Sequence, residues 1–372
     1  MTHAVRPLRV VAPGAGVLLE LRAALAGGDA IMVAAGVLDD LPEHVEHRVA
    51  LVVQTSGSTG RPKRVALSAD AVLANAAASE SALGGPGQWI LALPTHYIAG
   101  LNVLTRSIAA GIDPVTVPSA DDPTQHFTAH AFLDAVVRLT VPERFTALVP
   151  AQLATLLDDG AATEALAGFQ RVLVGGQATP AGLVERAATA GVKVTRSYGS
   201  SETSGGVVYD GVPIGTTAIQ VVDGEVHLGG PSVAEGYLND PAETAARFTT
   251  DGGLRWFRTA DTGSYEDGRL AIAGRLDDVI ISGGIKVSLG AIEQLLHANG
   301  FEDAVVVGAD DEKWGQAPIA FTSSNADPAP VISAIEAALG PAARPRVRRG
   351  SAIPILPSGK PDRVSLRAQA NE

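Results

Sequence analysis

Short apolar runs alternate with longer alanine-rich stretches through the first 200 residues of this chain. The runs that predict strands are residues 49–54, 89–94, 114–117, 145–149, 171–174 and 192–196. The stretches that predict helices are residues 69–83, 99–110, 127–139, 151–158 and 180–190. Strands separated by helices of about 10–15 residues are typical of α/β folds in which sheets and helices form layers. This alternation therefore predicts a large layered α/β domain.

The pattern changes after Gly205, where turn-forming pairs replace the helical stretches. Asp-Gly or Gly-Gly pairs, which predict hairpin turns, occur at residues 210–211, 223–224, 229–230, 252–253 and 267–268. Farther on, apolar runs at 279–281, 304–307 and 319–321 and helical stretches at 289–298 and 330–339 predict a small α+β fold. We therefore predict an N-terminal domain over residues 1–276, with a β-rich subdomain at about 205–275, and a C-terminal domain over residues 277–372.

The composition of the 372 residues excludes several classes of protein. The net charge is −12 at pH 7, which argues against a nucleic-acid partner, although residues 340–372 are basic. The absence of cysteine excludes disulfides, thiolate metal sites and a cysteine nucleophile. No apolar run reaches the roughly 18–20 residues of a membrane-spanning helix, and Pro13, Gly14 and Gly16 interrupt the apolar run near the N-terminus. We expect a cytoplasmic protein without a membrane span.

A hydroxyl- and glycine-rich loop, Thr55–Lys63, lies between two apolar runs that predict strands. Its glycines allow close approach of the backbone, successive amides can form an anion-binding nest, and the lysine can neutralise negative charge. A nucleoside-triphosphatase P-loop requires Gly-Lys followed by Ser or Thr. Here Arg61 and Pro62 separate Gly60 from Lys63. The loop therefore predicts phosphate binding of another kind.

The loop resembles the signature of the acyl-adenylate-forming (AMP-binding) superfamily, and further motifs of that family follow in the same order. Ser197–Thr203 resembles the family's Tyr-Gly-x-Thr-Glu, with Ser201 in place of threonine. Arg258–Asp261 resembles Arg-Thr-Gly-Asp, with Ala260 in place of glycine. The other matching segments are 94–100, 173–177, 224–231, 274–278, 282–287 and 356–363. The resemblance spans roughly residues 50–367, but the phosphate loop begins far earlier than in most members, so much of the usual N-terminal subdomain is missing or reduced.

The resemblance assigns a role to each matching residue. Phosphate binding falls to Thr55, Ser56, Gly57, Ser58, Thr59, Gly60, Lys63 and Ser201. Adenine and ribose binding falls to Gly175, Gly176, Gln177, Tyr198, Gly199, Asp261 and Arg275. Glu202 would hold Mg²⁺, Lys360 would reach the α-phosphate and the attacking carboxylate, and His96 would border the acyl pocket and is a candidate base, although a lone histidine is more often structural. Asp277 would be the hinge of a mobile C-terminal domain, and Gly283 and Gly284 would allow CoA to pass close to the backbone.

Within the superfamily, the short length and the run from Ser200 to Pro213 resemble actinobacterial o-succinylbenzoate–CoA ligases of menaquinone biosynthesis. The reaction would convert a carboxylate and ATP to an acyl-adenylate and then transfer the acyl group to CoA. The second carboxylate of that substrate needs a cation, for which Arg106, Lys193 and Arg196 are candidates that the sequence cannot rank. The alternatives are a short aryl- or fatty-acid–CoA ligase, an enzyme that loads a carrier protein, and an inactive nucleotide-binding sensor. The resemblance to the family also suggests that the protein is a homodimer.

Overall fold

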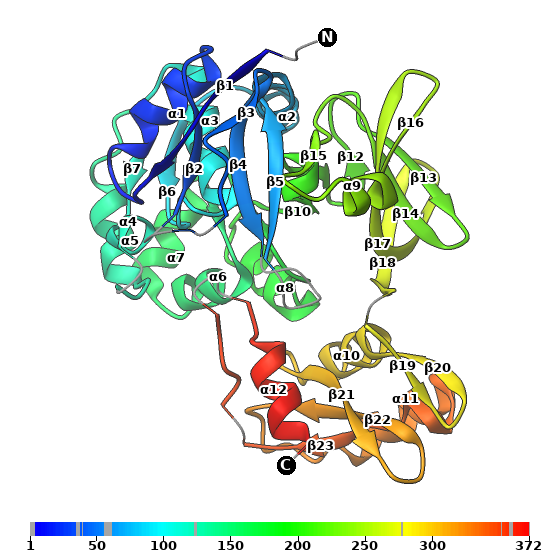
Figure 1. The fold of residues 1–372 in the computed structure, drawn as a ribbon. Helices are drawn as coiled ribbons and strands as arrows, with labels where there is room; N and C mark the ends of the chain where they lie inside the picture. The colour runs from blue at the N-terminus through cyan, green and yellow to red at the C-terminus, as the bar shows by residue number, and fades with distance from the viewer. Residues whose placement is uncertain are drawn as a thin grey trace.

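The computed structural model describes residues 4–34, 38, 40–55, 62–122, 125–276, 278–350, 352–356 and 360–371. Within these residues the strands form four sheets, of which two large ones make up the body of the molecule (Figure 1). The predicted loop residues Ser56 to Gly60 and the predicted hinge Asp277 lie outside the described residues.

The first large sheet has six strands in the order β15-β5-β4-β2-β1-β3. Its strands are β1 (Val5–Val11), β2 (Ala30–Val33), β3 (His44–Glu46), β4 (Val49–Thr55), β5 (Lys63–Ser68) and β15 (Gly236–Tyr237). β4 and β5 form an antiparallel hairpin in which Thr55 pairs with Lys63. The predicted phosphate loop therefore connects two buried strands whose ends are held in a fixed register.

The second large sheet has seven strands in the order β12-β11-β10-β9-β8-β6-β7. Its strands are β6 (Gln88–Leu91), β7 (Val115–Thr116), β8 (Arg144–Leu148), β9 (Arg171–Gly175), β10 (Val194–Ser200), β11 (Gly205–Tyr209) and β12 (Val212–Pro213). The strands from β7 to β10 are parallel, so their carboxyl ends meet at one edge. Open α/β sheets bind ligands at this edge.

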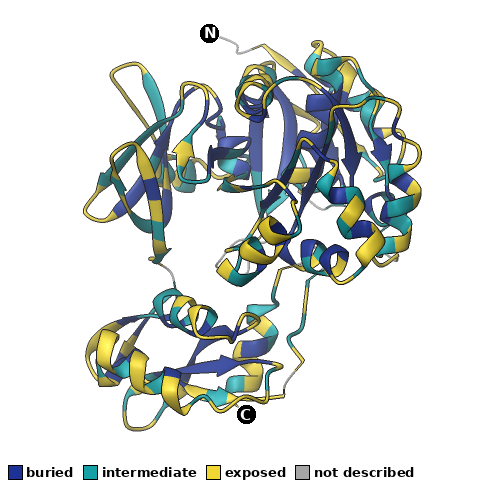
Figure 2. Ribbon diagram, turned by 180° about the vertical axis from the view of Figure 1, so that it is seen from behind, coloured by how far each residue is buried: buried dark blue, intermediate teal, exposed yellow. Residues whose placement is uncertain are grey.

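Helices separate and cover the two large sheets. α1 (Val17–Leu25), α2 (Ala69–Leu83) and α3 (Ile98–Ala110) contribute to an apolar core together with residues of both sheets, such as Leu51 and Leu91. The other face of the seven-stranded sheet is covered by α5 (Ala129–Val136), α6 (Pro150–Leu157), α7 (Gly160–Ala167) and α8 (Ala181–Thr189). The short helix α4 (Pro118–Asp121) contributes Ala120 to the first core. Figure 2 shows the buried strands enclosed between these helices. The prediction of a layered α/β fold is confirmed.

A smaller sheet follows, built from β13 (Ala218–Val222), β14 (Glu225–Gly229), β16 (Phe248–Asp251), β17 (Leu254–Glu266) and β18 (Arg269–Arg275). Predicted hairpin turns at 223–224, 252–253 and 267–268 connect its strands, and the turn at 210–211 connects β11 and β12 of the seven-stranded sheet. The predicted hairpin at 229–230 is wrong, because the chain turns after Gly230 but continues to β15 in the six-stranded sheet and does not pair back with β14. α9 (Pro241–Arg247) lies between β15 and β16 and connects the two sheets.

The tail has its own five-stranded sheet of β19 (Val279–Ser282), β20 (Ile285–Ser288), β21 (Val305–Asp311), β22 (Gly315–Phe321) and β23 (Arg346–Arg348). Its helices are α10 (Leu289–Ala298), α11 (Ala329–Leu339) and α12 (Arg363–Ala370). An apolar core that includes Ile292, Val306 and Ile335 packs the sheet against α10 and α11. The α+β class of the tail matches the expectation, whereas the exact domain boundaries stay a prediction.

None of the described helices is both long and apolar enough to cross a membrane.

Candidate active site

Residues from two neighbouring parallel strands meet at the carboxyl edge of the seven-stranded sheet. Gly175 ends β9 and is the register partner of Ser197 in β10, so Gly176 and Tyr198 follow at the same level. A Cβ atom on Gly199 would collide with the carbonyl group of Gly205, which explains glycine at this position. A short 3-10 helix, η1 (Ser201–Thr203), then carries the hydroxyl of Ser201 and the carboxylate of Glu202. Backbone without side chains, at Gly175, Gly176 and Gly199, therefore lies near the hydroxyl of Ser201 and the carboxylate of Glu202.

Asp261 of β17 joins this edge through two side-chain contacts. The hydroxyl of Tyr198 donates a hydrogen bond of 2.6 Å to Oδ2 of Asp261. Nη1 of Arg275 lies 3.3 Å from Oδ1 of the same carboxylate. Burial and then the negative charge of Asp261 raise the pKa of Tyr198, which keeps this hydroxyl protonated. Three of the predicted adenine- and ribose-binding residues, Tyr198, Asp261 and Arg275, therefore lie together.

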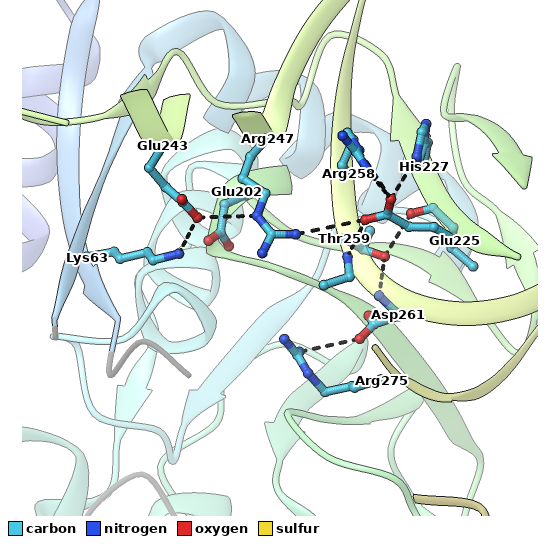
Figure 3. A network of polar contacts seen from close by, with 12 residues as sticks. Lys63, Glu202, Glu225, His227, Glu243, Arg247, Arg258, Thr259, Asp261 and Arg275 are labelled. Carbon is cyan, nitrogen blue, oxygen red and sulfur yellow. Dashed lines mark hydrogen bonds and ion pairs between the residues drawn. The ribbon is translucent and has the colours of Figure 1, made fainter. Parts of the chain in front are cut away.

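The irregular backbone of β17 just before Asp261, opposite the register shift in β14, depends on the buried carboxylate of Glu225. Ala260 has a φ of +63°, and its amide donates to Oε1 of Glu225 at 3.1 Å. Nη2 of Arg258 donates to the other carboxylate oxygen at 2.8 Å. Burial opposes ionisation of Glu225, but the hydrogen bonds from Arg258 and Ala260 outweigh it and lower the pKa of Glu225. Glu225 therefore remains ionised and fixes the backbone that carries Asp261 (Figure 3).

Glu202 is held by a tyrosine from the other large sheet. The hydroxyl of Tyr237 in β15 donates to Oε1 of Glu202 at 2.9 Å. Burial and the carboxylate of Glu202 raise the pKa of Tyr237. Magnesium in phosphate-transfer sites is commonly bound by one or two carboxylates together with substrate phosphates. The single fixed carboxylate of Glu202 fits that requirement, and no cluster of three acidic or histidine residues occurs elsewhere among the described residues.

Lys63 forms an ion pair instead of pointing freely into the site. Its Nζ lies 2.5 Å from Oε1 of Glu243 in α9 and 5.1 Å from the centre of the Tyr237 ring. The pKa of Glu243 is lowered, first of all by its hydrogen bond from Lys63. Figure 3 shows Glu202 beside the ion pair of Lys63 and Glu243.

Lys360 approaches the site from the tail. The segment before α12 extends upward to the body near α6 (Figure 1), and Lys360 lies at the end of a short antiparallel bridge between Ile355 and Pro361. Its Cε lies 3.8 Å from the position that a Cβ on Gly176 would occupy. Although Lys360 remains accessible to solvent, the surrounding protein desolvates its ammonium and lowers its pKa; Arg275 acts in the same direction, whereas Glu202 opposes it.

His96 and Arg106 follow β6 in the chain. The ring of His96 contacts Tyr97 at 4.1 Å between centres, and burial lowers the pKa of His96. Arg106 lies in α3, is only 5% exposed, and has its guanidinium 5.0 Å from the centre of the Trp89 ring. Its Nη2 donates to the hydroxyl of Tyr209 at 3.4 Å, and its Nε has no partner among the described atoms. No ion pair joins Arg106 to a described carboxylate, so this is a buried cation with free hydrogen-bonding capacity.

Of the remaining candidate residues, Gln177 follows β9 at this edge, whereas the others lie in other parts of the fold. Lys193 is exposed just before β10, and Arg196, also exposed, pairs with Asp210 at 3.0 Å. Gly283 and Gly284 form the turn between β19 and β20, where the amide of Gly283 donates to the carbonyl of Trp314 at 2.7 Å. Gln177 follows the Gly175-Gly176 turn and is partly buried.

The sequence did not single out several residues of the site: Tyr237, Glu225, Glu243, Arg247 and Tyr209. The spacing of Glu243 and Arg247, four residues apart after the helix-start signal Asp240-Pro241, could have indicated an ion pair on one helix face. Nothing in the sequence indicates that Glu243 also contacts Lys63, which is 180 residues away.

Comparisons with known proteins identify the family of the chain. The model of the AMP-binding enzyme family matches residues 33–238, and that of the AMP-binding enzyme C-terminal domain matches residues 292–360. A Mycobacterium tuberculosis protein named "Probable 2-succinylbenzoate–CoA ligase" is 38% identical over 381 residues, which cover 97% of each chain. The 2-succinylbenzoate–CoA ligase of Salmonella typhimurium is 32% identical over 73% of this chain and 58% of its own.

Solved structures share the fold. The amide bond synthetase McbA from Marinactinospora thermotolerans superposes with a TM-score of 0.75 at 27% identity, covering 98% of this chain and 80% of that chain. The o-succinylbenzoate CoA synthetase of Bacillus subtilis, in complex with its acyl-adenylate intermediate, has a TM-score of 0.73 at 22% identity, covering 97% and 87%.

Proposed function

This chain belongs to the AMP-binding enzyme family, and from this premise we propose that it is an ATP-dependent acid–CoA ligase that acts on 2-succinylbenzoate. The observation that carries the proposal is the match to the mycobacterial ligase over 97% of both chains. The site described above supports it, since it contains the carboxylate, hydroxyls and lysine that adenylate formation requires.

In the first half-reaction, a carboxylate oxygen of the acid attacks the α-phosphorus of ATP, and the bond to the pyrophosphate oxygen breaks. A carboxylate is already ionised at pH 7, so no base is needed and catalysis depends on alignment and on neutralising negative charge. Thr55, Ser201 and the amides of the loop over residues 56–60 would bind phosphate oxygens, and Lys360 would contact the α-phosphate and the attacking oxygen. Glu202 would hold Mg²⁺, which supplies positive charge to the phosphates.

The adenosine part of ATP would occupy the edge formed by β9 and β10. Tyr198 would stack on adenine above Gly175, Gly176 and Gln177, with Gly199 leaving room for the ring. Asp261, held by Tyr198 and Arg275, would accept hydrogen bonds from the ribose hydroxyls. This arrangement accounts for the closeness of the three side chains.

In the second half-reaction, the thiol of CoA loses its proton, its sulfur attacks the acyl carbonyl carbon, and AMP leaves. We expect the tail to rotate about Asp277, which withdraws Lys360 and presents the turn at Gly283 and Gly284 to CoA. His96 is the candidate to receive the thiol proton, since its lowered pKa keeps it neutral near pH 7. The proposed division into a body over residues 1–276 and a mobile tail over residues 277–372 follows from this scheme.

The second carboxylate of 2-succinylbenzoate would be bound by Arg106. Among the three candidate cations, Arg106 alone is buried; Lys193 is exposed, and Arg196 is exposed and already paired with Asp210. A buried guanidinium without a described carboxylate partner can offer two hydrogen bonds to a ligand carboxylate.

The test is exchange of pyrophosphate into ATP over a panel of acids, followed by measurement of CoA consumption. We expect 2-succinylbenzoate to support both reactions. Exchange with aryl or fatty acids but not with 2-succinylbenzoate would refute the substrate, and transfer to a carrier protein or an amine without use of CoA would refute the acceptor. ATP binding without exchange for any acid would indicate an inactive nucleotide-binding protein. The expected location in the cytoplasm and the homodimer remain predictions, to be tested by fractionation and by light scattering.

A further inference from the structure

Charged side chains of alternating sign connect the six-stranded sheet to the smaller sheet through α9. Oε1 of Glu243 lies 2.5 Å from Nζ of Lys63 and 3.2 Å from Nε of Arg247. Nη1 of Arg247 lies 3.9 Å from Oε1 of Glu225. We call Lys63, Glu243, Arg247 and Glu225 the charge row, which Figure 3 shows from end to end.

One end of the charge row lies at the phosphate side of the site. Lys63 opens β5 directly after the loop, where it pairs with Thr55 of β4. Its ammonium also lies over the ring of Tyr237, whose hydroxyl donates to Glu202. The position of Lys63 therefore affects both the end of the loop and the carboxylate that would hold Mg²⁺.

The other end of the charge row lies at the ribose side. Glu225 accepts the amide of Ala260, and the next residue, Asp261, donates its amide to Oγ1 of Thr259 at 2.9 Å. The positive φ of Ala260 is unfavourable for a residue with a Cβ, so the backbone needs such contacts to remain in this conformation. Displacement of Glu225 would therefore alter the direction of the Asp261 side chain.

The middle of the charge row is fixed by the local structure of α9. The side chain of Asp240 accepts the amide of Glu243, which sets the start of the helix. Glu243 and Arg247 are four residues apart with the acid first, the favourable order on a helix. Both side chains are less than one third exposed, so solvent screens their interactions only in part.

We propose that Glu243 and Arg247 are positioning residues that fix Lys63 relative to Asp261 in β17, so that the phosphate and ribose sides meet ATP in one arrangement. This inference rests on the proposed function in that ATP is taken as the ligand. Neither residue contacts the nucleotide; each acts through Lys63 or through Glu225.

The test compares the binding of ATP and AMP to the full chain by calorimetry, because AMP lacks the phosphates that the Lys63 side would meet. For Glu243→Gln we expect the dissociation constant for ATP with Mg²⁺ to rise about five- to tenfold, as is typical for a coupled contact. The constant for AMP should stay within about twofold, since Glu225 still holds the ribose side. Arg247→Met should weaken ATP binding less, and Arg247→Lys should restore it because an ammonium at this position can still pair with Glu243.

The matched control is Arg9→Met, which removes an arginine that pairs with Glu20 at 3.1 Å in another part of the molecule. It should leave both constants unchanged, and thermal unfolding should show that all variants are folded. If Glu243→Gln leaves ATP binding unchanged or strengthens it, Glu243 only competes with phosphate for Lys63, and the inference is wrong. An equal loss for ATP and AMP would also overturn it, since that result indicates general disruption.

The outcomes separate this inference from the proposed function. Binding of ATP and AMP requires no acid, so an incorrect acyl substrate leaves the test intact. Failure of the unaltered chain to bind ATP would refute both at once.

Discussion

Replacement of Arg106 by methionine should weaken binding of the acid and at the same time stabilise the fold. Methionine has a similar unbranched stem and can fill the space beside Trp89. The hydroxyl of Tyr209 would keep its 2.7 Å hydrogen bond with Ser79. The substitution thus removes the charge without leaving this hydroxyl unpaired.

The magnitudes follow from the surroundings of Arg106. Hydrogen bonds to charged groups contribute about 1.5–3 kcal/mol, so loss of the guanidinium should raise KM for 2-succinylbenzoate about 10- to 100-fold. A buried charge without a carboxylate partner destabilises the folded state, whereas the contact of the Arg106 guanidinium with Trp89 stabilises it by about 1 kcal/mol. We expect a net gain on the order of 1 kcal/mol, which would raise the unfolding midpoint by about 1–3 °C in a chain of this size.

The assay is pyrophosphate exchange with 2-succinylbenzoate and with 4-oxo-4-phenylbutanoate, which lacks the ring carboxylate. Arg106→Met should raise KM for 2-succinylbenzoate but not for 4-oxo-4-phenylbutanoate. The KM values of the two acids should therefore become more similar. Arg196→Met, which removes an exposed arginine paired with Asp210, is the matched control and should leave KM for both acids unchanged. A lower unfolding midpoint together with an unchanged KM would show that Arg106 is structural and refute the reasoning.

Other predictions concern the two half-reactions, the ionisation of His96 and the positive φ of Ala260 before Asp261. Lys360→Ala should slow adenylate formation about 10²–10³-fold but spare thioester formation from supplied acyl-adenylate; equal loss in both would contradict the rotation of the tail. Because the pKa of Lys360 is lowered, adenylate formation by the unaltered chain should decline with rising pH before the ordinary lysine value of about 10.4 is reached, as a pH–rate profile would show. The NMR titration midpoint of the His96 ring should lie below about 6.5, and a higher value would contradict its burial. Gly283→Ala should slow thioester formation more than adenylation, since its Cβ would press on Trp314 at a positive φ; stopped-flow measurement of each half would test this. Ala260→Gly should relieve the positive φ and leave activity within about twofold of normal, as steady-state kinetics would show.

The sequence predicted the strands and helices whose apolar runs are long and bounded by turn residues. The run at residues 49–54 became β4, and the alanine-rich stretch at 69–83 became α2, which Ser68 caps at its start. It missed β20, because Ile285–Ser288 alternates polar and apolar residues over only four positions. It also missed α12, whose eight residues bury only Leu366. Short elements with one buried side chain give too weak a periodic signal to be recognised without their neighbours.

The candidate site was predictable where a motif fixes several residues in a row, as at Tyr198 and Glu202. Contacts between residues far apart in the sequence could not be predicted. Ala260 was visible as a departure from glycine, but its support by Glu225, 35 residues earlier, depends on the register shift between β14 and β17. Similarly, the three candidate cations for a second carboxylate are equivalent in the sequence. Only their burial and their existing partners distinguish them.

The same physical distinction separates structural charges from charges available to a ligand. Lys63 and Arg196 each have a carboxylate partner in the folded chain, so a ligand must compete with that partner for them. Arg106 and Lys360 form no ion pair with the described carboxylates, and both are at least partly desolvated by surrounding protein. Because a desolvated cation without a counterion is unfavourable, an anionic ligand gains more at these two positions than at a neutralised one. This difference is the reason for proposing that Arg106 binds the second carboxylate of the acid and that Lys360 binds the reacting phosphate, while Lys63 fixes the geometry between them.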